Sequence, residues 1–183
     1  MKIINQKSKM RFLVLLLIIC SFTWTINAVG DLSKPSRNFR IGDNYRVWYR
    51  YNGNTGYFTC VIEFYRPRDW FMIGWGTSET DIDSWVFQID GNEVHVSDRY
   101  WGRTSLPRTD RSLGGRNDLE RLGYLVERDK TTVKIRRRLN THDRWDKVIR
   151  TGERAIYWAF GSDSRLSERN LRRGRVFRRI RAD

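Results

Sequence analysis

From Tyr45 onward, apolar and polar residues alternate along the chain, and turn residues interrupt the alternation at short intervals. A period of two places every second side chain on the same face, as in a half-buried β-strand. Residues 52–54 and 90–92 separate such runs in the way that hairpin turns do. No run keeps a helical period for more than a turn or two, so the pattern constrains the chain to an all-β fold.

The alternation predicts about eight strands. They lie at residues 45–51, 56–65, 70–77, 84–89, 93–99, 119–127, 132–139 and 155–161. The chain has 8 tryptophans, and those on these strands supply bulky side chains for a core between two sheets. We therefore expect one domain, an antiparallel β-sandwich with immunoglobulin-like architecture.

The start of the chain has a different composition. Basic residues precede an apolar run at residues 12–24, which is too short for a membrane span of about 20 apolar residues. A basic start, a short apolar run and small residues after it predict a signal peptide over residues 1–30, cleaved after Ala28 or Gly30. An uncleaved anchor is the alternative. We expect a secreted, extracellular protein without a transmembrane segment.

After the signal peptide we expect a leading loop at residues 31–42, the sandwich at residues 43–163 and an arginine-rich tail at residues 164–183. Cys20 would leave with the leader, so Cys60 would have no partner for an intrachain disulfide. Phe58, Cys60 and Ile62 share one strand face, which predicts a buried thiol. An intermolecular disulfide or a reactive nucleophile are the alternatives.

Two charged residues fall on apolar strand faces. Asp98 has the parity of Val94 and Val96, and Arg137 has the parity of Ile135. A buried charge needs a partner, so we expect Asp98 and Arg137 to form a structural buried pair, either directly or through Asp143 or Asp146. A lock at one end of the sandwich is the structural interpretation. A polar ligand pocket under the loop at residues 100–117 is the functional one.

The chain is strongly basic, with 35 Lys and Arg against 21 Asp and Glu. Two groups of basic residues are candidates for binding an anion: Lys134, Arg136 and Arg138 on one strand face, and Arg169, Arg172 and Arg173 near the C-terminus. Outside the cell, arginines of this density suit a sulfated glycan, an anionic lipid or an acidic protein. Secretion argues against nucleic acid, and a solvated basic end without a partner is the alternative.

The residues for catalysis or metal binding are sparse. His95 and His142 are the two histidines; one is expected on a solvent-facing strand position and the other in a loop, which favours solvated side chains over ligands. Asp81 and Asp83 could help to hold calcium, but no ligand-rich loop follows them, so the polar start of a strand is the preferred interpretation. We expect no catalytic residues and no metal site.

Five stretches carry a resemblance to a known family. They are YRVW (45–48) with residues 62–64, DWFMIGWG (69–76), VHVSDRY (94–100) with Pro107 and Asp110, RRLNTHD (137–143) with Asp146, and WAFG (158–161). Their succession resembles the DOMON domain, the module found beside the copper domains of dopamine β-monooxygenase-like enzymes, over residues 43 to about 174. The resemblance implies a β-sandwich whose members bind haem or sugar or serve as interaction modules.

The resemblance also places the haem ligands of the haem-binding members. An axial histidine would stand at Arg169, and a methionine would follow the strand at residues 70–76, where residues 77–84 contain none. A guanidinium has no lone pair to give to iron, so we expect no haem or other cofactor.

We therefore expect a secreted, non-catalytic DOMON-like module that binds an anionic extracellular partner. A haem or redox module with unexpected ligands is one alternative. A sugar-binding module that uses exposed Trp101 and Trp145 is another, and a remnant that only dimerises is a third.

Overall fold

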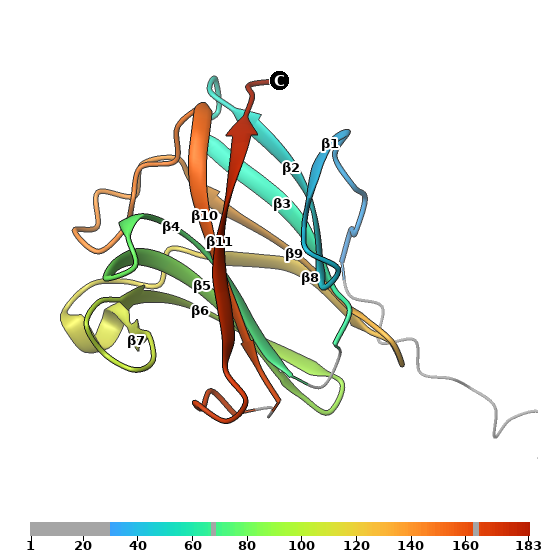
Figure 1. Cartoon of the computed structure of the whole chain (residues 1–183). Coiled ribbons are helices and arrows are strands. Elements are labelled where there is room, and N and C mark those ends of the chain that lie inside the picture. Colours follow the sequence, from blue (N-terminus) through green and yellow to red (C-terminus); the bar gives the residue numbers. More distant parts are fainter. Residues whose placement is uncertain (1–29, 67–68, 163–164) are drawn as a thin grey trace, which may run out of the picture.

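The computed structural model describes residues 30–66, 69–162 and 165–183, so the expected signal peptide lies almost wholly outside the described residues. Within these ranges, eleven strands form two antiparallel sheets (Figure 1). The strands are β1 (Arg37–Ile41), β2 (Tyr45–Asn52), β3 (Tyr57–Phe64), β4 (Trp70–Ser78), β5 (Asp81–Asp90), β6 (Glu93–Trp101), β7 (Arg108–Thr109), β8 (Glu120–Val126), β9 (Thr131–Arg138), β10 (Gly152–Gly161) and β11 (Arg172–Ile180). A short 3-10 helix, Asp110–Leu113, follows β7. In this part of the chain, no helix has the length and apolar character needed to cross a membrane.

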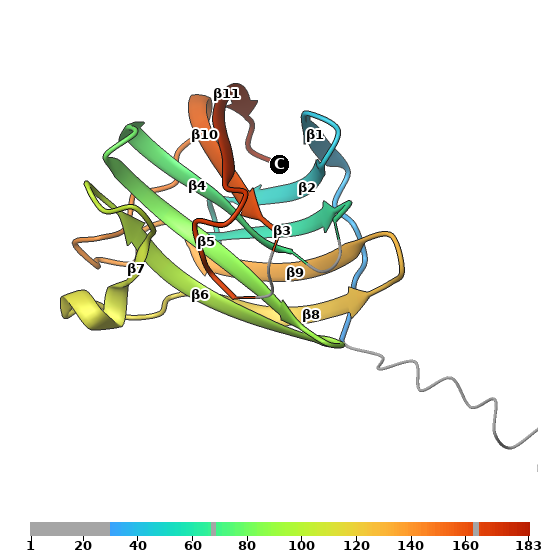
Figure 2. The same ribbon diagram turned by 60° about the horizontal axis from the view of Figure 1, so that its bottom comes forward.

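The two sheets face each other as a sandwich, which confirms the expected all-β fold (Figure 2). One sheet has five strands in the order β1-β2-β3-β9-β8, and the other has six in the order β11-β10-β4-β5-β6-β7. β9 therefore lies inside its sheet, whereas β11 is an edge strand. The C-terminus comes to lie between β11 and β1, where the edges of the two sheets approach each other (Figure 2).

Aromatic side chains fill the space between the sheets. The ring of Phe71 stacks on Phe64 of the opposite sheet at 4.3 Å and on Phe87 of its own sheet at 4.6 Å between centroids. The hydroxyl of Tyr45 on β2 donates to the carbonyl oxygen of Ala159 on β10 at 2.6 Å, which ties the two layers together. Burial of this apolar area is the main favourable contribution to the fold.

Cys60 lies on the core face of β3 and is fully buried. It is a free cysteine, which confirms the predicted buried thiol. Burial raises the pKa of its thiol, because the thiolate would lose its hydration. A buried, protonated thiol is a poor nucleophile and is inaccessible to a second chain.

The two segments expected outside the sandwich both form strands. β1 occupies part of the expected leading loop, and β11 occupies the middle of the expected arginine-rich tail. β11 pairs along β10 from Phe160↔Arg172 to Gly152↔Ile180. Its inner face carries Val176 and Ile180, which pack on the core, and arginines dominate its other positions. The alternation of apolar and polar residues is weak in β11, because an edge strand needs few apolar residues on its inner face.

Gly174 shows how closely β11 packs on β10. A Cβ atom at this position would lie 2.6 Å from the indole of Trp158. Any larger residue would force the indole or the strand to move, so glycine is required here.

Candidate functional site

A group of charged side chains lies inside one end of the sandwich. The guanidinium of Arg137 is fully buried and places Nη1 2.6 Å from Oδ2 of Asp83 and 3.3 Å from Oδ1 of Asp146. Its Nη2 donates to the carbonyl oxygen of Lys147 at 2.7 Å. The backbone N–H of Lys147 donates to the same Asp83 oxygen at 2.8 Å. One arginine thus binds β9, β5 and the β9–β10 connection together.

Four segments bring carboxylates to this end of the molecule. Asp83 comes from β5, Asp98 from β6, Asp110 from the start of the 3-10 helix and Asp146 from the connection between β9 and β10. Asp98 and Asp110 are both buried, with exposed fractions of 2% and 1%. We call Asp83, Asp98, Asp110, Asp146 and Arg137 the buried charge cluster.

Burial and mutual repulsion dominate the electrostatics of the cluster. Burial, followed by the charge of Asp83, raises the pKa of Asp98 to about 9. Burial and the charge of Asp146 raise the pKa of Asp110 to about 8. Burial disfavours the charge of Arg137, but the neighbouring aspartates outweigh this effect and raise its pKa above the usual range. The arginine therefore stays charged while the carboxylates compete for protons.

The expected pair of Asp98 and Arg137 lies inside this cluster, but the contacts differ from a simple pair. Arg137 binds Asp83 and Asp146, whereas Oδ2 of Asp98 accepts a hydrogen bond from the backbone N–H of Asp118 at 3.2 Å. Asp143 lies elsewhere and accepts from the backbone N–H of Arg116 at 2.6 Å.

Asp83 and Asp110 were not predicted to belong to this cluster. A signal for Asp83 existed, because it shares the parity of Trp85 and Phe87, which face the core. Asp110 carried no such signal, because it begins a single helical turn in a long polar segment.

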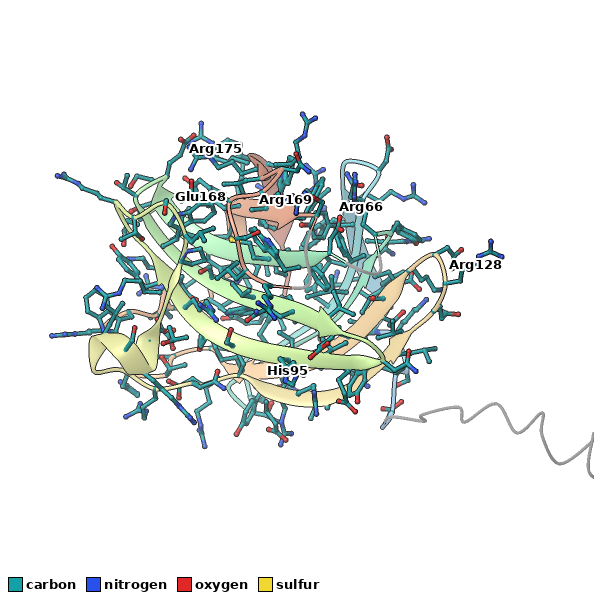
Figure 3. The ribbon with its side chains drawn as sticks, turned by 90° about the horizontal axis from the view of Figure 1, so that it is seen from below. Arg66, His95, Arg128, Glu168, Arg169 and Arg175 are labelled. Atoms are coloured by element: carbon teal, nitrogen blue, oxygen red, sulfur yellow. The ribbon has the colours of Figure 1, made fainter. Side chains whose placement is uncertain are left out.

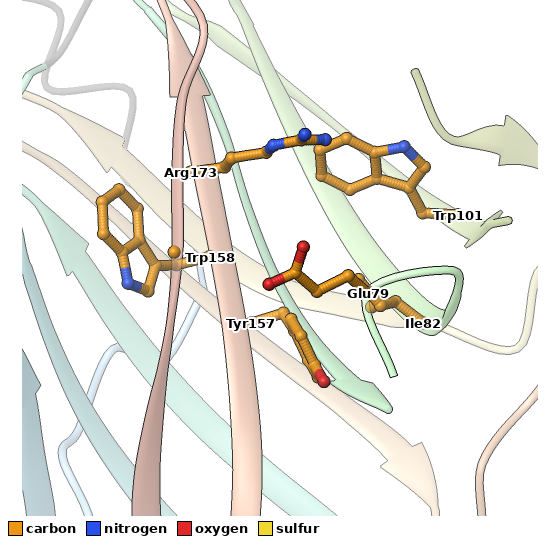
Figure 4. A pocket seen from close by; sticks show the side chains of 7 residues that line it. Glu79, Ile82, Trp101, Tyr157, Trp158 and Arg173 are labelled. Atoms are coloured by element: carbon orange, nitrogen blue, oxygen red, sulfur yellow. The ribbon is translucent and has the colours of Figure 1, made fainter. Parts of the chain in front are cut away.

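The outer face of the six-stranded sheet carries a second feature, a small apolar cluster around Trp70, Met72 and Tyr157. Leu106, Leu166 and Leu171 from the adjoining loops pack against it. Beside this cluster lies a cavity of about 160 Å³, which is smaller than the roughly 300–1,000 Å³ that holds a drug-sized ligand. The cavity is lined by Glu79, Ile82, Trp101, Tyr157, Trp158, Arg173 and Gly174 (Figure 4).

The two tryptophans expected as exposed sugar platforms are both engaged with the protein. Trp101 is 3% exposed, and its Nε1 donates to the carbonyl oxygen of Thr104 at 2.9 Å. The ring of Trp145 lies 4.9 Å from that of Tyr100, and its Nε1 donates to the carbonyl oxygen of Leu113. Neither presents the free face on which a sugar ring stacks.

The two expected groups of anion-binding residues lie on different sheets. Lys134, Arg136 and Arg138 point outward from β9 in the five-stranded sheet, whereas Arg172 and Arg173 begin β11 in the six-stranded sheet. Nζ of Lys134 lies 2.8 Å from Asp31, and Arg136 binds both carboxylate oxygens of Glu120 at 2.6 and 3.0 Å. The row on β9 is therefore largely neutralised by the chain itself, and the two groups do not form one site.

The arginines of β11 are in the opposite situation. We call Arg173, Arg175 and Arg179, with Phe177 between them, the β11 face; their side chains alternate to the exposed side of the edge strand, and Phe177 is 55% exposed. Among the described residues, no carboxylate forms an ion pair with these arginines. Arg173 lies over the ring of Trp101 at 5.5 Å and Arg175 over that of Phe177 at 5.4 Å.

The family model of the DOMON domain matches residues 41–161, which is more than half of the chain. The chain belongs to the DOMON family. The match ends at the last residue of β10, so the family model does not include the edge strand β11.

Two solved structures share the DOMON fold of this chain. One is the cytochrome b domain of pyranose dehydrogenase from Coprinopsis cinerea, with a TM-score of 0.60, 19% identity, and coverage of 78% of this chain and 80% of that chain. The other is the cytochrome domain of cellobiose dehydrogenase from Myriococcum thermophilum, with a TM-score of 0.59, 10% identity, and coverage of 79% and 81%. A comparison with curated proteins found no match.

Because these structural neighbours are cytochrome domains, haem is the cofactor to test against the residues of this DOMON domain. Among the described residues that line the outer-face cavity, none offers an imidazole or a thioether, the pair that holds haem in electron-transfer cytochromes. Tyr157 offers a phenol in the cavity wall, and Met72 is buried in the sheet beneath. The described lining therefore does not supply a histidine and methionine pair for haem.

The histidines and the residue expected at the axial position lie elsewhere. His95 is an exposed residue of β6, and His142 is an exposed loop residue with a φ of 59°. Arg169 lies in the connection between β10 and β11, where its carbonyl oxygen accepts from the backbone N–H of Ser162 at 3.4 Å. Figure 3 shows His95 and Arg169 on separate parts of the molecule.

Proposed function

We propose that the protein is a secreted, non-catalytic DOMON module that binds a linear sulfated glycan through the β11 face. The observation that carries this proposal is the set of exposed arginines on β11 that have no carboxylate partner among the described residues. Because a strand rises about 3.4 Å per residue, Arg173 and Arg175 are about 7 Å apart along the strand, and Arg179 lies about 20 Å from Arg173. A row of this length suits an extended polyanion.

The chemistry of the β11 face favours sulfate groups. Guanidinium groups bind tetrahedral anions with two parallel hydrogen bonds. The rings of Trp101 and Phe177 lie under two of these guanidiniums, which reduces the conformational freedom that binding would have to remove. Phe177 adds an exposed apolar surface between the charges for the ring of a sugar.

The edge of β11 adds further positive charge next to this face. A cleft of about 360 Å³ between β11 and β1 is lined by Arg37, Asn38, Phe39, Tyr49, Arg178, Arg179 and Arg181. Arg179 lines this cleft and also belongs to the β11 face, so a polyanion on the face would have a basic continuation at its end.

Heparin chromatography with two double variants tests the proposal. Reversing Arg173→Glu and Arg175→Glu removes charge from the β11 face, and reversing Arg128→Glu and Arg138→Glu makes the same change of net charge on and beside the other sheet. We expect the first double variant to elute at a much lower salt concentration than the wild type and the second to elute close to it. Equal shifts would mean that net charge alone governs retention, as for a solvated basic surface.

Binding to vesicles that contain anionic lipid tests the competing partner. Retention by such vesicles, together with failure to bind size-defined heparin oligosaccharides, would replace the glycan by a membrane surface.

The haem alternative keeps one supporting observation, which is the fold shared with cytochrome domains. An absorption spectrum of the secreted protein, produced with a haem supply, tests it. We expect no Soret band, because the described lining of the outer-face cavity offers neither an imidazole nor a thioether. A Soret band that persists through gel filtration would overturn the proposal of a module without a cofactor.

A further inference from the structure

The buried charge cluster contains more negative than positive charge. One carboxylate oxygen from each of Asp83, Asp98 and Asp146 lies within 4.8 Å of the other two. The three residues belong to β5, β6 and the β9–β10 connection, so the fold, rather than a single loop, brings them together. We propose that Asp83, Asp98 and Asp146 form a buried calcium site at this end of the sandwich, with Asp110 as an adjacent carboxylate.

The spacing of the oxygens suits calcium. Calcium binds oxygen ligands at about 2.3–2.6 Å, so two ligands of one ion lie at most about 5 Å apart. Oxygens that all lie within 4.8 Å of one another fall inside the span that one calcium ion can bridge. Magnesium demands near-ideal octahedral geometry and gives up its waters reluctantly, so a buried group of carboxylates suits calcium better.

Oxygen atoms without hydrogen-bond partners provide an independent observation. Oδ1 of Asp83 and Oδ1 of Asp98 are buried and have no hydrogen-bond partner, and the same is true of both oxygens of Asp110. Asp110 is not one of the three proposed ligands, but it is buried and its charge raises the pKa of Asp98. Buried carboxylate oxygens are rarely left without a donor or a cation, because an unpaired buried charge loses its hydration without compensation.

The cluster also holds more carboxylates than cations, which favours binding of a metal ion there. Arg137 offsets one of the four carboxylates, and the ammonium of Lys147 is bound to Asp81 at 2.5 Å instead of to the cluster. A divalent cation would offset two more charges. The competing way to neutralise the cluster is to protonate Asp98 and Asp110, and that state would bind no metal.

Terbium luminescence distinguishes these two states. Tb³⁺ replaces calcium at oxygen sites, and the ring of Trp85, 5.2 Å from the Arg137 guanidinium, is placed to transfer excitation to an ion in the cluster. The chain is first stripped with EDTA. We expect luminescence that saturates at one ion per chain and is displaced by Ca²⁺, and a melting temperature that rises with each tenfold increase in Ca²⁺.

Two variants of the β5–β6 hairpin provide the matched comparison. Asp98→Asn removes a ligand charge but leaves the partners of Arg137 in place, and Asp90→Asn makes the same change at the exposed turn of the hairpin. We expect Asp98→Asn to lose both the luminescence and the calcium-dependent rise in melting temperature, and Asp90→Asn to keep both.

Three results would overturn the site. They are a wild-type melting temperature that does not change between EDTA and millimolar Ca²⁺, terbium luminescence that does not saturate, and an Asp98→Asn variant that responds like the wild type. An unchanged melting temperature or luminescence that does not saturate would assign the cluster to the protonated state, and an Asp98→Asn variant that responds like the wild type would place the bound ion outside the cluster. None of them bears on the β11 face, so the two proposals can fail separately.

Discussion

Two strands of this molecule are rich in arginine, and the fold treats them in opposite ways. β9 ends in KIRRR and β11 reads RRGRVFRRI. On β9, Lys134, Arg136 and Arg137 all have carboxylate partners. On β11, the arginines have no such partner among the described residues. A run of arginines therefore does not by itself indicate a binding surface.

The position of each strand in its sheet explains the difference. β9 lies between β3 and β8, so its residues are surrounded by neighbouring chain on both sides. Carboxylates of the neighbouring segments therefore lie within reach of its charges, and the fully buried Arg137 must be paired because water cannot reach it. β11 lies at the edge of its sheet, where water solvates an arginine without the help of a carboxylate. Basic edge strands also resist pairing with another chain.

The largest difference should appear when one arginine is removed from each strand. Arg137→Met leaves Asp83 and Asp146 without their cation, so we expect a loss of about 3–5 kcal/mol in the free energy of unfolding. Arg175→Met removes an exposed charge, and its effect should stay within about 0.5 kcal/mol. Urea unfolding followed by tryptophan fluorescence measures both, and similar losses would contradict the contrast between the strands.

The pH dependence of stability tests the carboxylates that surround Arg137. The pKa of Asp98 is about 9 in the folded protein, against about 3.9 for an unperturbed aspartate. The folded state thus keeps a proton that the unfolded chain has released. The contribution of Asp98 to the free energy of unfolding therefore falls as pH rises from about 4 to about 9. In EDTA, we expect the urea midpoint of the wild type to fall between pH 5 and pH 9.

The Asp98→Asn variant serves as the control, since it cannot release that proton. Its urea midpoint should fall less steeply over the same range. A wild-type midpoint that rises with pH would show that Asp98 is ionised in the folded protein throughout this window.

A smaller effect is expected from Arg178, a β11 arginine whose side chain is bonded to the opposite sheet. Arg178 faces inward, and its Nε and Nη2 donate to the carbonyl oxygen of Arg40 on β1 at 3.1 and 2.6 Å. Arg178→Ala should lower the free energy of unfolding by about 1 kcal/mol. Its outward neighbour gives the comparison, as Arg179→Ala should leave thermal stability almost unchanged. Equal melting temperatures for the two variants would show that the contact with β1 contributes nothing.

The smallest effect concerns the exposed ion pair on β9. Arg136 binds Glu120 through two hydrogen bonds, but both side chains are substantially exposed. Arg136→Ala should cost between about 0 and 1 kcal/mol, because solvent and salt screen such pairs. A double-mutant cycle with Glu120→Ala isolates the energy of the pair. A coupling energy above about 1 kcal/mol would mean that the two side chains are less hydrated than their exposed fractions indicate.

Much of the fold could be predicted because alternation is a local signal. The parity of Asp98 and Arg137 with their apolar neighbours also placed both inside the sandwich. β11 was missed because its inner face carries few apolar residues, and Asp83 was interpreted as the polar start of a strand although its parity matches that of Trp85. The partner of Arg137 had no local signal, because this ion pair joins residues 54 positions apart.

The order of residues alone determines which side chains share a face, since backbone geometry makes successive side chains point to opposite sides of any strand. It therefore determines the two-layered fold, the inward position of Arg137 and the basic character of β11. Which arginine is neutralised and which stays free depends on how eleven strands are ordered in two sheets. Whether a charge is paired or solvated depends on burial and on contacts between distant segments, and both arise only when those segments pack together.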